Sequence, residues 1–429
     1  MKNFQIIIII IFIAAAVFGI LVFSGAIKIG DQSSRTGALG TVVLWGTVPA
    51  RDIASTLEEF NNTNQSFILK YVQKDSETFD QDLLEALASG TGPDLFFLPA
   101  NLAFHYLNRI FPIPYQSFSL ASFKSSFAGA GEVFLTSKGI LAFPIAIDPL
   151  VMYYNRSMLD ANNIVYPPAT WDEFANLVPS LTKKDENKKI IKSAAALGQF
   201  SNVTNAKDII STLFMQAGNS ILEERDNYFN STLGDSTKSN LSSVLGFYTD
   251  FSNPLKEVYS WNKSLPNSQD AFSADNLAFY FGYASELRSL INKNPNLNFL
   301  PTSMPQIKNS SFKLTSAKVT GIAVSSFSKN LNTALIAASM ISNSDFAAKF
   351  ANILGVAPAR RDLLAVKPTD AYFPIFYSSA LYAKAWLDPS PEDTDSIFRG
   401  MIENVLSNRM TTDDAISDAN SKLNLLLLK

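Results

Sequence analysis

The chain has 429 residues, of which 47% are hydrophobic and 17% are charged, and this length and composition predict two well-packed domains. The formal net charge of −3 lacks the basic surplus of nucleic-acid-binding proteins, so no nucleic acid partner is expected. There is no cysteine, which excludes disulfides, thiolate metal sites, a cysteine nucleophile and a lipidated cysteine. We expect neither a cofactor nor a metal ion.

The N-terminal segment, residues 1–27, has the character of a membrane element. Its central part, Ile6–Phe23, is a run of 18 residues without a charged or polar side chain, and Lys2 precedes it. A membrane-spanning helix needs about 17–25 residues, whereas the apolar region of a secretory signal usually has about 7–15. A retained anchor is therefore favoured over a cleaved signal, although Ser24-Gly25-Ala26 would suit cleavage. In both cases residues 28–39 form a tether and the rest of the chain lies outside the cytoplasm.

Strand and helix patterns alternate after the tether. Short apolar runs predict strands, and apolar residues three and four apart predict helices; the order is strand 41–45, helix 53–60, strand 67–72, helix 79–87 and strand 95–98. This order predicts a parallel, doubly wound sheet, and such sheets bind ligands beyond the carboxyl ends of their strands. We therefore expect Trp45 and Asn101 at the wall of a cleft. The ring of Trp45 suits stacking on a sugar, but packing in a core is the equal alternative.

The run from Ile140 to Tyr154 organises the middle of the chain. It is apolar or aromatic throughout except for Asp148, and it contains Pro144 and Pro149. Such a run is typical of a strand buried on both faces, but proline cannot donate a ladder hydrogen bond. We therefore expect two strands separated by a crossing between domains near residues 146–150. Asp148 would lie in that crossing, and a carboxylate in such apolar surroundings needs a partner. We predict that this partner is a ligand. The alternative is a structural role, in which Asp148 bonds to nearby backbone N–H groups.

Helices dominate the pattern after this run. Thr170 and Glu173 have the spacing of a capping box at the start of a helix. The acidic stretch PEDTD at residues 391–395 is typical of a helix start rather than a calcium site, because acidic residues are favoured at that end of a helix. Three helices are expected at the C-terminus, at residues 371–387, 396–406 and 412–427.

Three further residues after this run are candidates for ligand contact. Asn202 lies in a polar loop after an expected strand at 194–197, and Tyr283 follows an expected strand at 277–281 and begins a helix. Backbone N–H groups at the start of that helix would favour polar ligand atoms. Trp261 has polar neighbours, which makes a place in the core less favoured. For all three, ligand contact and a structural role both remain open.

Four segments together resemble the extracellular solute-binding proteins of ABC importers, in particular their sugar-binding branch. They are GTGPDLFFL at 90–98, GILAFPIAIDPLVMYYNRSML at 139–159 with PPATWDEF at 167–174, VTGIAVSSFSKN at 319–330 and GVAPARRD at 355–362. The resemblance implies an α/β, two-lobe periplasmic-binding-protein-like fold (type II), with the solute trapped between the lobes. It places residues 40–146 and 304–348 in lobe one, and residues 149–302 and 349–429 in lobe two.

The resemblance also implies a function. The chain would be a monomer that captures a sugar or oligosaccharide and delivers it to ABC permease subunits, and its N-terminal helix would replace the lipid anchor of many bacterial relatives. Asp148 matches a position where sugar-binding relatives often have a carboxylate. Asn101 stands where some relatives have an acidic acceptor for sugar hydroxyls, and Leu98 where others have an aromatic ring.

Two other classes of function remain as alternatives. An enzyme is disfavoured, because the chain has a single histidine, His105, and no G-x-S-x-G, H-E-x-x-H or P-loop motif. A glycosidase needs only two carboxylates, but no acidic pair is expected on facing strand ends. A surface interaction module could keep the two-lobe fold without serving a transporter, because a fold does not define a function.

Overall fold

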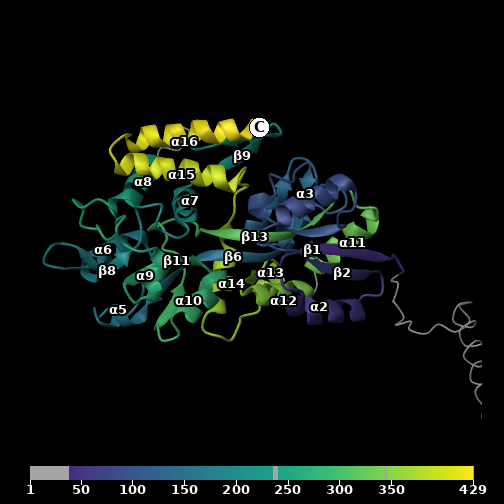
Figure 1. Ribbon diagram of the computed structural model, residues 1–429, viewed down its shortest axis with the longest axis horizontal. Coiled ribbons are helices and arrows are strands. Elements are labelled where there is room, and N and C mark those ends of the chain that lie inside the picture. The colour runs from purple at the N-terminus through teal and green to yellow at the C-terminus, as the bar shows by residue number, and fades with distance from the viewer. Residues whose placement is uncertain (1–37, 235–239, 344, 429) are drawn as a thin grey trace, which may run out of the picture.

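One mixed β-sheet runs through the computed structural model, which describes residues 38–234, 240–343 and 345–428. Across these residues the sheet has 11 strands, and its main path runs β2 (Ile68–Gln73), β1 (Thr41–Gly46), β3 (Leu95–Pro99), β13 (Thr315–Val324), β6 (Ala142–Asn155), β11 (Leu277–Tyr283), β8 (Ile190–Ala195) and β7 (Lys183–Lys184). The molecule has two lobes, and β6 and β13 lie in the middle of the sheet, where the lobes meet (Figure 1).

The first lobe has the strand and helix order that the sequence predicts. β1 pairs in parallel with both β2 and β3, and the connecting helices are α2 (Ala50–Thr63) and α3 (Phe79–Ser89). α3 ends at Gly90, whose φ of 70° is a left-handed conformation that glycine adopts without strain. β13 adds to β3 in antiparallel orientation, so the sheet is not parallel throughout.

β6 is one continuous strand of 14 residues, so the prediction of two strands separated by a crossing is wrong. Pro144 lies at a β-bulge, where the register of β6 against β13 skips one residue, and bulges tolerate proline. Pro149 lies where one edge of β6 has no strand beside it, because β14 (Ala357–Pro358) pairs only as far as Ile147 and β11 begins to pair at Leu150. The strand therefore accommodates both prolines and passes without a break from one lobe to the other.

The second lobe is built around β11, which pairs antiparallel with β6 and parallel with β8. The capping box predicted at Thr170 and Glu173 is present at the start of α6. The other elements of this part of the chain are α5 (Arg156–Asp160), α6 (Trp171–Leu181), α7 (Ala206–Gln216), β9 (Leu222–Arg225), β10 (Tyr228–Ser231), α8 (Leu241–Asp250), α9 (Ser268–Ser273), η3 (Ala284–Glu286), α10 (Leu287–Lys293) and β12 (Phe299–Thr302).

Helices predominate after β13, and α15 and α16 run side by side over the second lobe (Figure 1). α15 begins with the acidic stretch PEDTD, as expected. The elements are α11 (Leu331–Ser342), α12 (Asp345–Leu354), α13 (Arg361–Leu364), α14 (Phe373–Leu381), β15 (Ala383–Lys384), α15 (Pro391–Leu406) and α16 (Thr412–Leu427). Short elements complete the first lobe: η1 (Ala100–Leu102), α4 (Leu120–Ser126), η2 (Gly129–Phe134), β4 (Leu135–Thr136) and β5 (Gly139–Ile140).

The buried apolar side chains form two separate cores, one in each lobe. Along β6 the first core ends at Ile147 and the second begins at Leu150, so Asp148 lies at the division between them. Phe350 of α12 belongs to the first core, which means that the chain does not leave the first lobe at residue 348 as the expected boundary required. The other expected boundaries stay predictions.

No helix among the described residues is long and apolar enough to cross a membrane. The anchor or signal expected at residues 1–27, and most of the tether expected at 28–39, lie outside the described residues. Both therefore stay predictions.

Candidate ligand-binding site

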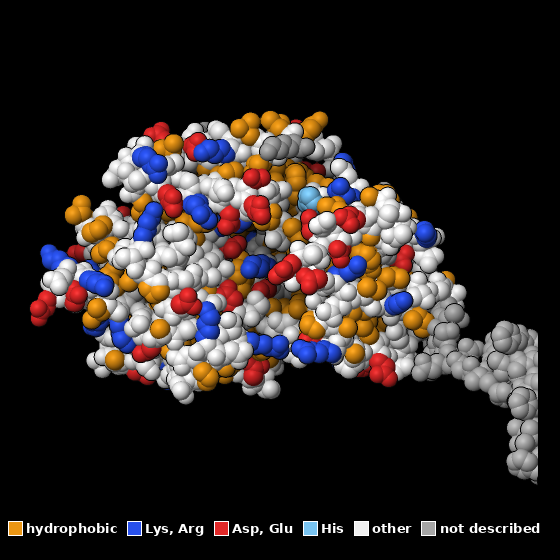
Figure 2. All heavy atoms as spheres, viewed as in Figure 1, with side chains coloured by type: hydrophobic (Ala, Val, Ile, Leu, Met, Phe, Trp, Pro, Cys, Tyr) orange, Lys and Arg blue, Asp and Glu red, His pale blue; other side chains and the backbone are white. Residues whose placement is uncertain are grey.

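A cavity of about 400 Å³ lies between the lobes, where β6 and β13 cross from one to the other. Figure 2 shows acidic and basic side chains gathered around the hollow in the middle of the molecule. The walls come from the end of β3, the middle of β6 and β13, the start of α7, the end of β11, and the segment from β15 to the start of α15. Their polar and charged side chains include Asn101, Asp148, Lys207, Asp208, Lys318 and Thr320.

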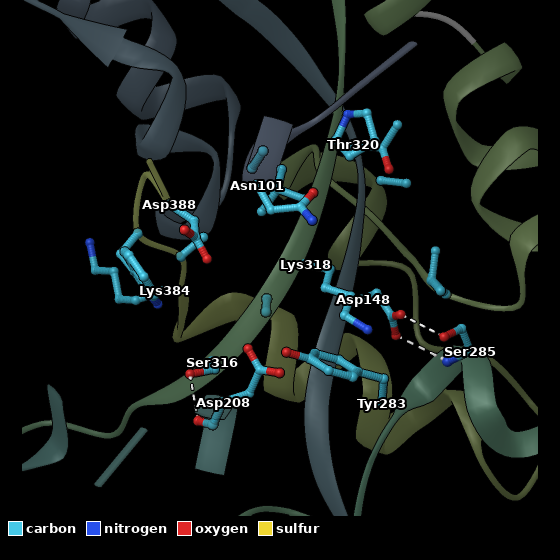
Figure 3. A pocket seen from close by; sticks show the side chains of 18 of the residues that line it. Asn101, Asp148, Asp208, Tyr283, Ser285, Ser316, Lys318, Thr320, Lys384 and Asp388 are labelled. Carbon is cyan, nitrogen blue, oxygen red and sulfur yellow. Dashed lines mark hydrogen bonds between the residues drawn. The ribbon is translucent and has the colours of Figure 1, made fainter. Parts of the chain in front are cut away.

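Asp148 points from β6 into this cavity and is held by Ser285 at the start of η3 (Figure 3). It accepts one hydrogen bond from the Ser285 backbone N–H at 3.0 Å and one from the Ser285 hydroxyl at 2.6 Å. Burial raises the pKa of Asp148 to about 6; the bonds from Ser285 and the charge of Lys318 lower it, while Glu286 raises it further. The carboxylate is therefore oriented but incompletely compensated.

Lys318, Tyr283 and Asp208 form the centre of the cavity (Figure 3). Lys318 on β13 is the cross-strand partner of Asp148, and its Nζ lies 3.9 Å from the centroid of the Tyr283 ring. The Tyr283 hydroxyl points toward the Asp208 carboxylate (Figure 3). Burial raises the pKa of Asp208 against the opposing effects of Lys318, Lys207 and Tyr283. One ammonium group thus lies among two carboxylates and an aromatic ring.

Lys207 links two walls of the cavity by ion pairs. Its Nζ lies 3.0 Å from Oδ2 of Asp388 and 2.9 Å from Oδ1 of Asp395, and the Lys207 and Asp388 side chains are only 13% and 6% exposed. Burial lowers the pKa of Lys207, but the two aspartates outweigh it and the net shift is upward. These contacts join the start of α7, where Asp208 also lies, to the start of α15.

Among the described residues, no group of three or more histidine, cysteine, aspartate or glutamate side chains has the geometry of a metal site. The cavity instead offers carboxylate acceptors beside ammonium and amide donors. Such a set can hold a polar solute that both donates and accepts hydrogen bonds.

The family model of bacterial extracellular solute-binding proteins matches residues 55–374. The chain belongs to this family. No curated protein matches this solute-binding protein by sequence.

Solved structures share the fold of this solute-binding protein. A cyclo/maltodextrin-binding protein complexed with maltotetraose has a TM-score of 0.72 at 15% identity, covering 89% of this chain and 96% of that one. The cyclic α-maltosyl-1,6-maltose binding protein of Arthrobacter globiformis has a TM-score of 0.73 at 14% identity, covering 90% and 98%. An ABC transporter solute-binding protein of Thermotoga lettingae bound with α-D-tagatose has a TM-score of 0.64 at 18% identity, covering 90% and 99%. At these identities the likeness establishes the two-lobe fold.

Asn101, Asp148 and Tyr283, all expected at a ligand site from the sequence, lie together in the walls of the cavity. Asn101 comes from η1 in the first lobe, Tyr283 from the end of β11 in the second, and Asp148 from the strand that joins them. Their convergence follows from the carboxyl ends of β3 and β11 facing the same gap between the lobes.

The other three candidates lie outside the walls of the cavity. Trp45 is 9% exposed in the first core, with Nζ of Lys74 3.9 Å from its ring centroid. Trp261 is 1% exposed in the second core, where its large apolar surface is buried despite its polar sequence neighbours. Asn202 donates hydrogen bonds from its side chain to the carbonyls of Asn262 and Leu265, and so ties two loops of the second lobe together.

Sequence reasoning missed Asp208, Lys318 and the ion pairs of Lys207. Lys318 had a usable signal, because it is the single charge in the strand TSAKVTGIAV, the same kind of isolation that singled out Asp148. Asp208 resembles an ordinary acidic residue in the first turn of a helix, so only its place beside Tyr283 marks it as part of the site.

Proposed function

We propose that this solute-binding protein captures a sugar in the inter-lobe cavity, outside the cytoplasm, and delivers it to the permease of an ABC importer. The observation that carries the proposal is the convergence of Asp148, Asp208 and Lys318 in one inter-lobe cavity. Carboxylates accept hydrogen bonds from sugar hydroxyls and an ammonium group donates to their oxygens. Several structural neighbours carry bound sugars, from tagatose to maltotetraose, which supports this class of solute.

Closure of the lobes around the solute is part of the proposal. Asn101 comes from the first lobe, whereas Asp208 and Tyr283 come from the second, so one solute could contact both lobes at once. Binding to both would favour the closed arrangement, because a ligand shifts a conformational equilibrium by its difference in affinity for the two states. We further propose that residues 1–27 keep the protein at the outer face of the membrane and that it acts as a monomer.

The direct test is a carbohydrate panel screened by thermal denaturation and followed by calorimetry. A bound sugar should raise the free energy of unfolding by about 2.7 kcal/mol at one hundred times its dissociation constant. Asp208→Asn should reduce that gain, whereas the control Asp160→Asn, at an exposed site on α5, should retain it. Failure of every carbohydrate to stabilise the wild-type protein would contradict the proposed function.

We propose that the cavity binds its solute without reacting with it. Both oxygens of Asp148 accept hydrogen bonds from Ser285, which suits a fixed acceptor for solute hydroxyls better than a catalytic acid or nucleophile. Hydrolysis of a bound oligosaccharide during long incubation would favour a glycosidase instead. A surface interaction module would predict that neither sugar binding nor lobe closure occurs. Small-angle scattering with and without a sugar that binds tests the closure of the lobes, since closure should reduce the radius of gyration.

A further inference from the structure

The cavity has few aromatic surfaces for a sugar ring to stack on. Its aromatic lining residues among those described are Tyr283 and Trp386. Tyr283 is 1% exposed, and its ring has the Lys318 ammonium group over one face. The ring of Trp386 stacks on Phe398, with centroids 6.3 Å apart and an interplanar angle of 25°.

The volume of the cavity is also small. About 400 Å³ lies near the lower end of the range of roughly 300–1,000 Å³ that small-molecule sites span. The segment Lys384–Trp386 lines both this cavity and a larger one of about 790 Å³. The pairing of β15 with β13 holds this segment in place, and the volume of the first cavity by itself suits a short sugar better than a long oligosaccharide.

The charges of the cavity are nearly balanced. Four aspartates and three lysines line it: Asp148, Asp208, Asp388, Asp395, Lys207, Lys318 and Lys384. Lys207 is paired with Asp388 and Asp395, and Lys318 lies among Asp148, Asp208 and the Tyr283 ring (Figure 3). This balance favours a neutral solute over a strongly anionic or cationic one.

We infer, on the basis of the proposed function, that the solute is a neutral sugar of one or two rings. Its hydroxyls are held by the carboxylates of Asp148 and Asp208 and by the Lys318 ammonium group, and ring stacking contributes little. Asp208 is the main determinant of specificity, because its carboxylate lies in the cavity wall and faces the Tyr283 hydroxyl (Figure 3). A sugar hydroxyl forms a stronger hydrogen bond with a charged carboxylate than with a neutral acceptor.

Calorimetry with sugars of increasing length tests this inference on the wild-type protein. The series comprises glucose, tagatose, mannobiose, maltose, maltotriose and maltotetraose. We expect binding by at least one member with one or two rings, and no gain in affinity when a third or fourth glucose ring is added to maltose. An affinity that rises with every added ring, or binding confined to the longer chains, would overturn this inference and leave the proposed function standing. If no carbohydrate binds, the proposed function fails and this inference fails with it.

Variants separate hydrogen bonding from stacking with whichever short sugar binds best. Asp208→Asn should weaken binding about tenfold or more, which corresponds to the loss of a hydrogen bond to a charged group. Trp386→Leu should change the affinity by less than about threefold, and Asp160→Asn should leave it unchanged. Thermal denaturation of each variant checks that it is folded. A large loss of affinity in Trp386→Leu, together with an unchanged affinity in Asp208→Asn, would show that stacking dominates. This result would contradict the inference.

Discussion

Ser285 donates two hydrogen bonds to Asp148, one from its backbone N–H at 3.0 Å and one from its hydroxyl at 2.6 Å. The pair joins η3 in the second lobe to the point on β6 where the two apolar cores divide. Any change in the charge of Asp148 therefore acts at the junction between the lobes.

Ser285→Ala should destabilise the protein in a pH-dependent way. The Ser285 hydroxyl favours the ionised form of Asp148 and lowers its pKa, so its removal penalises the folded state most when Asp148 is charged. We expect a loss of about 1.5–3 kcal/mol at pH 8 and a smaller loss at pH 4.5. Urea denaturation at both pH values measures this, with the exposed Ser157→Ala as control. An equal loss at both pH values would show that the hydroxyl does not act through the Asp148 charge.

Asp148→Asn should remove one part of the pH dependence of stability. Burial raises the pKa of Asp148 from 3.8 to about 6 in the folded protein, so the folded state binds more protons than the unfolded state between these values. The contribution of Asp148 to stability therefore falls as the pH rises from about 4 to 6, and stays low above that range. The variant lacks this fall, so its stability relative to the wild type should increase from pH 4 to pH 7.

The same substitution should weaken solute binding at pH 7.5 by roughly tenfold to a hundredfold, as for the loss of a hydrogen bond to a charged group. Calorimetry with the sugar identified by the panel measures this. A structural role for Asp148 predicts the opposite pattern: an unfolding midpoint that drops at all pH values, and an unchanged affinity of the folded variant.

Lys207→Met should be strongly destabilising, because it leaves the buried Asp388 carboxylate without the lysine that pairs with it at 3.0 Å. Removal of one partner from a buried ion pair typically costs about 3–5 kcal/mol. The matched control is Lys256→Met, which breaks an exposed pair with Asp250 and should cost less than about 1 kcal/mol. Equal losses in the two variants would mean that burial of the Lys207 pairs has no energetic consequence.

Thr170→Ala should cost about 1 kcal/mol, because it removes the N-cap of α6. The Thr170 side chain accepts from the Glu173 backbone N–H at 3.3 Å, and the Glu173 side chain accepts in return from the Thr170 N–H at 3.3 Å. Thermal or chemical denaturation measures the loss, and Thr369→Ala, at an exposed site outside any helix, is the control. Sugar affinity should not change, since neither Thr170 nor Glu173 lines the cavity.

Local features of the fold were predictable from the sequence because they depend on neighbouring residues. The βαβαβ order of the first lobe and the capping box of α6 follow from apolar spacing and from side chains three positions apart. Pro144 and Pro149 predicted a broken strand, but a bulge against β13 and the gap between β14 and β11 spare both prolines from central ladder positions.

The candidate site was predictable only where one residue stood out within its own segment. Asp148 stood out as the single charge in a long apolar run, and Tyr283 and Asn101 follow directly after strands. Trp45 and Trp261 have the aromatic rings that a sugar site would use, but a ring buries equally well in a core. Their neighbours in the sequence do not reveal which surface they face, and the packing of both lobes puts them inside.

The two α/β lobes, the family and the isolated carboxylate at the junction could all be predicted from local sequence patterns, since they depend on periodicity and on motifs of adjacent residues. The charges that meet in the cavity are brought together by the packing of the two lobes. Lys207 and Asp388 are 181 positions apart, and Asp148 and Ser285 are 137 apart. No local sequence pattern predicts such pairs. The residues become neighbours only after β6 and β13 pair across the junction and the helices of the second lobe pack beside them.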